Sequence, residues 1–370
     1  MIWTPTTLGE VAEVNWGNTS VTKKSYTPDG IQAYSASGPD GFVAWAEHDS
    51  PGVVVSAIGA HCGKSWYAKG SWTPIKNTLW YRSNDPEVET RYLYYVTHDP
   101  EIWPRRGAAQ PFISKGDAKE IPIQLPNLET QRIIIAVLQT FDDLIENNRR
   151  RIEILEEMAR LLYREWFVHF RFPGHEDVEL VDSDLGPIPG GWSVGPLRSV
   201  ATVVGGNSAT KASYVSDGYV AFSASGPDGR LDTYDVDGHG VVLSAVGARC
   251  GRTFRASGQW SSIANTIRFQ PINGFYAAWL YLATADPTIW PRRGSAQPFV
   301  SINDVRNTRL LVPSDALLED FEILARPAFD LVQNLMDQNR VLDKARDLLL
   351  PRLVSGELDV SELDLGLVAE

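Results

Sequence analysis

The stretch "IWPRRGAAQPF" (Ile102–Phe112) returns almost unchanged as "IWPRRGSAQPF" (Ile289–Phe299). Other blocks repeat around it, and their offset drifts from 189 to 187 along the chain. They are "WTPTTLGEVAEVNWGN" from Trp3 with "WSVGPLRSVATVVGGN" from Trp192, "YSASGPDG" from Tyr34 with "FSASGPDG" from Phe222, and "VVVSAIGAHCGK" from Val53 with "VVLSAVGARCGR" from Val241. A slowly drifting offset is typical of a duplicated domain with small loop deletions. The 370 residues suffice for two domains that each bury a core.

The composition is that of a globular, non-membrane protein, with 43% hydrophobic and 22% charged residues. We expect a cytoplasmic location, because no apolar run is long enough for a membrane span and no signal peptide precedes the first repeat. Cys62 and Cys250 are repeat equivalents, so we expect them to fill the same packing position rather than to pair. The net charge of −12 does not exclude DNA binding, since much of the acid lies in 176–185 and after 356.

Each repeat begins with a β-rich part and ends with a long amphipathic helix. Runs such as "GVVVSAIG", "TLWYRS", "GVVLSAVG" and "TIRFQP" favour short strands, and "ETRYLYYVTHD" and "GFYAAWLYLATAD" favour short helices. We predict an α+β fold in which two β-rich domains are joined by two long helices packed as an antiparallel coiled coil, with an internal pseudo-two-fold repeat. The β-rich domains would then lie at opposite ends of a rod.

The helices are predicted from apolar residues spaced alternately by three and four. The first seam comprises Leu138, Phe141, Ile145, Asn148, Ile152, Leu155, Ala159, Leu162 and Trp166. The second comprises Phe321, Leu324, Ala328, Leu331, Leu335, Gln338, Leu342, Ala345 and Leu349, with a kink or late start allowed at Pro327. In an antiparallel arrangement, Asn148 and Gln338 fall in adjacent layers, where a hydrogen bond between them would fix the register. The alternative is that the two polar residues are unrelated.

These patterns predict domain boundaries. They are a first β-rich domain at 1–126, a first helix at 127–172, a linker at 173–190, a second β-rich domain at 191–313, a second helix at 314–356 and an acidic tail at 357–370.

Catalytic chemistry is missing from the repeated positions. No histidine recurs, and Asp40 and Asp228 lie within Gly-Pro-Asp-Gly, which favours a turn over a catalytic carboxylate. The spacing of Gly59 and Gly63 is one residue short of a phosphate-binding loop, so a glycine turn between strands is favoured. We predict no catalytic residue, no metal site and no bound cofactor.

Side chains suited to DNA recognition do recur. Arginine forks match phosphate oxygens or guanine, glutamine can read adenine, and serine and lysine can contact the backbone or base edges. The predicted DNA contacts are Lys23, Ser35, Ser37, Lys64, Arg105, Arg106, Gln110 and Lys115 in the first copy, and Lys211, Ser223, Ser225, Arg249, Arg252, Arg292, Arg293 and Gln297 in the second. Trp103 and Phe112 are expected to brace the loop.

The whole chain resembles the DNA-specificity subunits of type I restriction-modification systems. The resemblance rests on the segment from Gly107 through "ETQRIIIAVLQTFDDLIENNRRRIEILEEMARLLYREWF", on "LGPIPGGWSVGPL" from Leu185 and on "LLLPRLVSGEL" from Leu348. It implies that each β-rich domain reads one half of a bipartite site in double-stranded DNA, and that the helices act as a spacer. It also implies two modification subunits that bring S-adenosylmethionine-dependent adenine methylation with base flipping, and restriction subunits that use ATP and Mg²⁺.

Because the two copies are alike even in their loops, we predict closely related, inverted half-sites. Asymmetry should originate at His61/Arg249, Phe42/Arg230 and Tyr67/Arg255. A duplicated protein- or glycan-binding adaptor would also explain the repeat, but it explains the paired arginine strings less well.

Overall fold

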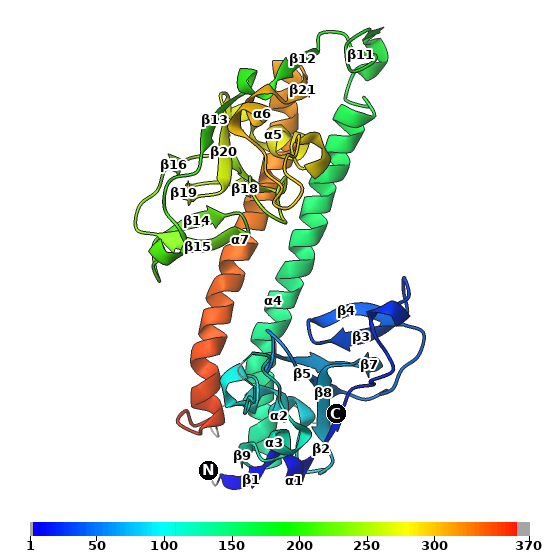
Figure 1. Cartoon of the computed structure of the whole chain (residues 1–370), viewed down its shortest axis with the longest axis vertical. Helices are drawn as coiled ribbons and strands as arrows, with labels where there is room; N and C mark the ends of the chain where they lie inside the picture. Colours follow the sequence, from blue (N-terminus) through cyan, green and yellow to red (C-terminus); the bar gives the residue numbers. More distant parts are fainter. Residues whose placement is uncertain (1–2, 108, 361–370) are drawn as a thin grey trace. The chain divides into compact units, whose positions relative to one another are not determined.

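The sequence repeat folds as two similar β-rich domains in a mixed α+β protein (Figure 1). The computed structural model describes residues 3–107 and 109–360. These form two compact units, one from residues 1–147 and 338–370 (unit 1) and the other from 148–337 (unit 2). Each unit therefore contains one β-rich domain, the start of the helix that follows it, and the end of the other copy's helix.

Unit 1 contains a four-stranded antiparallel sheet, a three-stranded sheet and a two-stranded ribbon. The first has the order β2 (Ala12–Trp16), β8 (Thr78–Ser83), β5 (Gly52–Ser56), β6 (Ser65–Ala68). The second has the order β4 (Gly38–Val43), β3 (Ile31–Ser35), β7 (Trp72–Pro74), and the ribbon pairs β1 (Thr4–Thr7) with β9 (Pro122–Leu125). Short helices are α1 (Leu8–Val11), α2 (Thr90–Val96) and α3 (Lys115–Lys119).

Unit 2 repeats this topology. Its sheets have the orders β13 (Ala201–Gly205), β20 (Thr266–Pro271), β17 (Gly240–Ser244), β18 (Thr253–Ala256), and β15 (Gly226–Leu231), β14 (Tyr219–Ser223), β19 (Gln259–Ser262), β16 (Val236–Asp237). The ribbon pairs β12 (Ser193–Pro196) with β21 (Arg309–Val312), and the short helices are α5 (Ala277–Ala283) and α6 (Ile302–Asn307). Asn77 and Asn265, which are repeat equivalents, both have a left-handed φ, at 72° and 67°.

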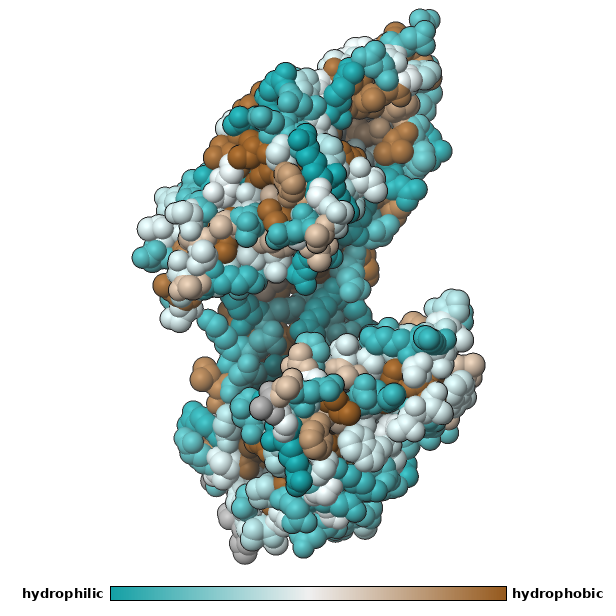
Figure 2. Space-filling model, in the orientation of Figure 1, coloured by the Kyte–Doolittle hydropathy of each residue, from teal (hydrophilic) through white to brown (hydrophobic). Residues whose placement is uncertain are grey.

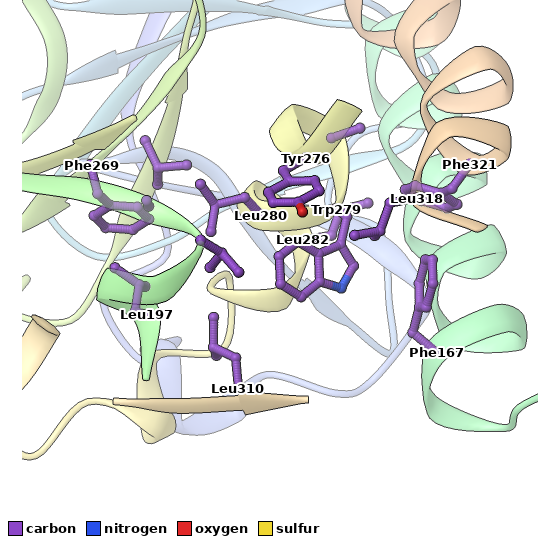
Figure 3. Close-up of a cluster of buried hydrophobic side chains, with 14 of the residues drawn as sticks. Phe167, Leu197, Phe269, Tyr276, Trp279, Leu280, Leu282, Leu310, Leu318 and Phe321 are labelled. Carbon is purple, nitrogen blue, oxygen red and sulfur yellow. The ribbon is translucent and has the colours of Figure 1, made fainter. Parts of the chain in front are cut away.

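The central strand of each domain is buried on both faces, which explains its continuous apolar run. In β5, Val53 and Val55 belong to the cluster that contains Leu93 of α2, whereas Val54 packs in the cluster of Trp72 from the second sheet. In unit 2 the larger core extends from the sheet to the long helices. Trp279 of α5 lies between Phe269 of β20 and the aromatic rings of Phe167 and Phe321 (Figure 3).

Two long helices complete the units, α4 (Leu128–Tyr163) and α7 (Asp315–Val354), and α4 continues into a π-helical turn at Arg164–Val168. In unit 1, Ile134 near the start of α4 shares a cluster with Leu353 at the end of α7. In unit 2, Phe321 near the start of α7 packs against Phe167, with 4.9 Å between ring centroids. The helix segments therefore run antiparallel within each unit.

The predicted seam of α4 is confirmed, because each of its residues is buried or half-buried and Asn148 is buried. The seam predicted for α7 is wrong in its middle part. Leu324, Leu331 and Gln338 are exposed, and the buried residues there are Ala325, Phe329, Val332, Leu335 and Asn339. Phe321, Ala325 and Phe329 face the domain core, so the domain as well as α4 decides which face is buried. The buried polar residue of α7 is thus Asn339, whose side chain donates to the Ile145 carbonyl at 3.4 Å.

Other expectations differ in detail. The helix α7 runs through Pro327 and begins at Asp315, so the late start near Ala328 is wrong. The segment predicted as a linker contains a small hairpin, β10 (Leu180–Val181) with β11 (Ile188–Pro189), and Ile188 is buried in the core of unit 2. Val360, in the predicted acidic tail, is buried in unit 1, and residues 361–370 lie outside the described part.

The two cysteines behave as predicted. Cys62 and Cys250 are both free and buried, and their thiols lie 3.5 and 3.4 Å from the carbonyl oxygens of Ala57 and Ala245.

One carboxylate joins three elements of unit 1. Asp142 of α4 accepts hydrogen bonds from Arg91 (3.0 Å) and Tyr95 (2.7 Å) of α2, and from Arg346 of α7 (3.1 Å). The side chain of Asp142 is only 22% exposed and that of Arg91 10%. A carboxylate bonded in this way orients both helices against the domain.

We predict that Asp142→Ala destabilises unit 1 by about 2 kcal/mol, because two guanidinium groups and a phenol lose a charged partner. Thermal unfolding of the full chain measures this. The neighbouring Asp143→Ala is the control, since its pair with Lys69 spans 3.7 Å and both side chains are more than half exposed. Equal melting temperatures for the two variants would contradict the role given to Asp142.

Candidate nucleic-acid interface

The repeated arginine string forms a braced loop in each unit. Trp103 is buried and its indole donates to the Thr97 carbonyl at 2.9 Å, which anchors the loop as predicted. The backbone groups of Arg106 and Phe112 pair at 2.8 and 2.9 Å and close the loop. Phe112 itself is 38% exposed, so it covers the loop only partly. Ala108 lies outside the described residues.

This loop is hydrogen-bonded to the glycine turn between β5 and β6. Gly59 N–H donates to the Pro111 carbonyl at 2.9 Å, and Gly247 N–H donates to Pro298 at 2.8 Å in unit 2. Because β5 and β6 are antiparallel neighbours, the turn is the strand connection that the spacing favoured over a phosphate-binding loop. We call the turn and the arginine loop together the loop cluster, residues 57–64 with 103–112 in unit 1 and 245–252 with 290–299 in unit 2.

The first arginine of each pair lies across the glycine turn. Arg105 donates to the Pro100 carbonyl at 2.8 Å and Arg292 to Pro287 at 3.0 Å. Gly251 has φ +91°, and a Cβ there would meet the Arg292 guanidinium at 3.0 Å. A glycine is needed at this position both for the backbone angle and for the close approach of the arginine.

The second arginine of each pair binds a helix-capping carboxylate. Arg106 donates to Asp117 at 2.5 Å and Arg293 to Asp304 at 2.6 Å. The bond from Arg106, together with that from Ser114, lowers the pKa of Asp117. The arginine side chains remain 62% and 61% exposed, so each guanidinium keeps donors that face solvent. These side chains brace the loop and can still bind an anion or a base.

The Gly-Pro-Asp-Gly block starts a strand, so the turn predicted there is wrong. The hairpin reverses just before it, at Ala36–Ser37, and Asp40 lies in β4. Asp40 binds Lys23, and its carboxylate accepts bonds from Tyr26 (2.5 Å) and Ser35 (2.7 Å). Burial would raise the pKa of Asp40, but these bonds hold it below its ordinary value.

The same arrangement recurs in unit 2, where Asp228 binds Lys211 (2.5 Å), Tyr214 (2.7 Å) and Ser223 (2.7 Å). Ser35 and Ser223 are 3% exposed and their hydroxyls are used internally. They are therefore structural residues rather than the DNA contacts that we predicted. Lys23 and Lys211 are exposed but paired.

The remaining candidates fall into two groups. Lys115 is tied to the Asn15 side chain at 2.5 Å, and the Arg249 guanidinium donates to the Ser225 carbonyl at 3.2 Å. The others are exposed, and they are Ser37, Lys64, Gln110, Ser225, Arg252 and Gln297. The two glutamines lie in the loop cluster of each unit, where an amide can reach a base edge.

The positions where asymmetry was predicted are not equivalent in exposure. Arg230 donates to the Gly218 carbonyl, and Arg255 is 14% exposed and lies over the Phe329 ring at 4.8 Å. His61 and Arg249 are both exposed in the loop cluster. Arg346 and Arg160 of the long helices, which the sequence motifs do not indicate, adjoin the loop clusters of units 1 and 2. No local sequence signal connects them to those loops.

Within residues 3–107 and 109–360, no group of three or more histidine, cysteine or acidic side chains could hold a metal ion. In the same part of the chain, no helix is long and apolar enough to cross a membrane.

The chain is similar to proteins of one family. Residues 2–157 match the model of the type I restriction modification DNA specificity domain. The chain is 27% identical over 323 residues to the type I restriction enzyme MjaIX specificity subunit of Methanocaldococcus jannaschii, covering 78% of this chain and 74% of that protein. The first copy of the repeat thus matches this DNA specificity domain, and the chain as a whole is similar to a type I specificity subunit.

A second relative and one solved structure are also similar to this chain. The chain is 29% identical over 150 residues to the putative type I restriction enzyme MjaX specificity subunit of the same organism, which is 38% of this chain and 35% of that one. The fold resembles the crystal structure of the type I restriction-modification S subunit from M. genitalium, with a TM-score of 0.62, 16% identity and 96% coverage of both chains.

We predict that Arg106→Ala and Arg293→Ala each weaken DNA binding of the specificity subunit by about tenfold. If the arginine contacts a phosphate, its loss would lower the affinity for all DNA sequences. If it contacts a base, its loss would relax the sequence preference at one half-site only. Binding is measured in the assembled complex. Arg132→Ala is the control, because Arg132 is also 62% exposed and ion-paired but lies on α4. Unchanged binding by both loop variants would make the loop a scaffold.

Proposed function

We propose that this specificity subunit reads a bipartite site in double-stranded DNA, one half with each β-rich domain. The observation that carries the proposal is the duplicated loop cluster, which has the same backbone hydrogen bonds in both units. Each cluster offers a half-exposed arginine and an exposed glutamine at equivalent positions. These are the side chains that bind guanine and adenine edges in the major groove.

The two half-sites are closely related and inverted. The arginine loops differ within residues 102–112 and 289–299 only at Ala108/Ser295, and the residues that were predicted to create asymmetry reduce to one exposed pair, His61/Arg249. Similar side chains on similar backbones have similar base preferences. A near-palindromic bipartite target follows.

We expect single-molecule methylome sequencing of cells that express this chain with its modification subunit to reveal such a target. The two halves should match, when one is inverted, at most base positions. His61→Arg should make the halves more alike, and the wild type is the control. Two unrelated half-sites would contradict the proposal.

The long helices provide docking surfaces for two modification subunits. Large apolar side chains are exposed at corresponding positions of the two helices. The corresponding positions are 187 residues apart, as the two arginine strings are. They are Leu144, Val341 and Leu348 in unit 1, and Leu331, Ile154 and Leu161 in unit 2. Figure 2 shows hydrophobic patches among hydrophilic side chains on the face it draws of each unit. Exposed apolar residues repeated in register favour two copies of one partner.

This chain determines which DNA sequence is bound, and the partner subunits carry out the reactions. The modification subunits would supply S-adenosylmethionine-dependent adenine methylation, and restriction subunits would supply ATP- and Mg²⁺-dependent translocation and cleavage. This chain binds none of these cofactors itself. Such a complex acts on DNA in the cytoplasm, where we place the protein.

We predict that Leu161→Glu and Leu348→Glu each remove one of two modification subunits, because burying a leucine contributes about 2 kcal/mol and burying a glutamate costs free energy. Native mass spectrometry of the complex gives the stoichiometry. Glu153→Gln, on an exposed position of α4, is the control. Retention of both partners in both variants would exclude this surface. A chain that binds neither a modification subunit nor DNA would favour the adaptor alternative.

A further inference from the structure

A pocket in unit 2 gathers four arginines. It has a volume of about 700 Å³ and lies among the loop cluster, α5 and the end of α4. Arg249, Arg252 and Arg292 come from the loop cluster and Arg160 comes from α4. None of the lining residues is acidic, and Tyr281 and Phe254 provide part of an apolar wall.

Three of these guanidinium groups have no carboxylate partner among the described residues. Arg249 donates only to the Ser225 carbonyl (3.2 Å) and Arg292 only to the Pro287 carbonyl (3.0 Å). Arg252 is exposed, and its guanidinium makes no hydrogen bond or ion pair within the described chain. Arg160 is paired with Glu156 (3.0 Å) and Glu157 (3.2 Å). Like charges held this close repel one another unless an anion joins them.

Unit 1 has the equivalent pocket, of about 680 Å³, but with balanced charges. Its basic side chains are Lys64, Arg105 and Arg346, and its acidic ones are Asp99, Glu101 and Asp347. Arg105 is neutralised by Glu101 at 3.0 Å, and Arg346 by Asp142 at 3.1 Å and Asp347 at 3.0 Å.

Three differences make the unit 2 pocket more positive, whereas Arg346 of the unit 1 pocket corresponds to Ala159, which removes one positive charge. From unit 1 to unit 2, His61 becomes Arg249, Glu101 becomes Thr288, and Asp347 becomes Arg160. The loss of the Glu101 carboxylate at Thr288 leaves Arg292 without the partner that Arg105 has. The unit 2 pocket is therefore lined by four arginines and no acidic residue, whereas three basic and three acidic side chains line the unit 1 pocket.

We propose that the unit 2 pocket is a binding site for phosphate groups and that its counterpart in unit 1 is not. Guanidinium forks match phosphate oxygens in geometry, and several converging arginines suit a multiply charged anion better than a single carboxylate. The apolar wall lowers the local dielectric and strengthens the attraction. The phosphates belong either to the DNA backbone or to a free polyphosphate.

The pocket adjoins the loop that carries Arg293, the predicted DNA contact of unit 2. A backbone phosphate held by Arg249, Arg252 and Arg292 would anchor that loop on the duplex. The second domain would then bind DNA more tightly than the first, although both read related sequences. The phosphate site itself does not depend on the half-site proposal.

The test exchanges residues between the two pockets of the full-length chain. Arg249→His with Thr288→Glu gives unit 2 the residues of unit 1 at these two positions, and His61→Arg with Glu101→Thr does the reverse. Arg309→Glu is the control, since it lowers the net charge equally on an exposed residue of unit 2 outside this pocket. Circular dichroism and melting temperature establish that each variant is folded.

Isothermal titration with pyrophosphate at low salt measures the site directly. We expect the wild type to bind one pyrophosphate, the Arg249→His/Thr288→Glu variant to bind at least about tenfold more weakly, and the reverse variant to gain a second site. The control should bind like the wild type.

The salt dependence of DNA binding by the assembled complex identifies the source of the phosphate. Loss of one or two backbone contacts in the Arg249→His/Thr288→Glu variant would lower the slope of log K against log[salt] by about 1 to 2. A lower slope would mean that the pocket binds a phosphate of the DNA backbone. Weaker pyrophosphate binding with an unchanged slope would mean that the pocket binds a free polyphosphate. If the variant matches the control in both pyrophosphate binding and salt dependence, the proposal of a phosphate site is wrong. This outcome is independent of the methylome result, which tests the half-site proposal.

Discussion

The Asp142 carboxylate determines how unit 1 is closed. It binds Arg91 and Tyr95 of α2 and Arg346 of α7, so residues from the two ends of the chain meet on one acidic group. A mostly buried carboxylate is stable as an anion only with such partners. The end of the second helix is therefore part of the first domain's structure. The sequence repeats are not the folding units, because each domain needs the end of the other copy's helix.

The two units achieve this closure with different chemistry. The equivalent of Asp142 in unit 2 is Phe329, whose ring is covered by Arg255, which in turn stands where unit 1 has Tyr67. In unit 1 the residue at the position of Arg255 is the aromatic partner instead of the cation, since Arg91 lies over the Tyr67 ring at 4.5 Å. Each helix end therefore fits its own domain, which disfavours exchange between copies.

Much of the fold could be predicted from the sequence because it depends on local patterns. The runs "TLWYRS" and "TIRFQP" are β8 and β20, and the repeat offsets predicted the shared topology. The seam of α7 could not be predicted in its middle part, because a period near 3.5 or 3.6 leaves the buried face free to rotate until its neighbours are known. That is why Asn339, not Gln338, is buried. The burial of Ser35 and the convergence of Arg160 with Arg249 depend on tertiary contacts, which no local pattern records.

Each β-rich domain is completed by the end of the other copy's helix, and hydrogen-exchange mass spectrometry of the full-length Leu353→Ala variant tests this most directly. Leu353 lies at the end of α7, is 1% exposed and shares a cluster with Tyr92 and Tyr95 of α2. Removing it costs about 2 to 4 kcal/mol of packing. We predict faster exchange in α2 (Thr90–Val96) and unchanged exchange in α5 (Ala277–Ala283), although α5 is far nearer in sequence. Faster exchange in α5 with α2 unaffected would contradict the account.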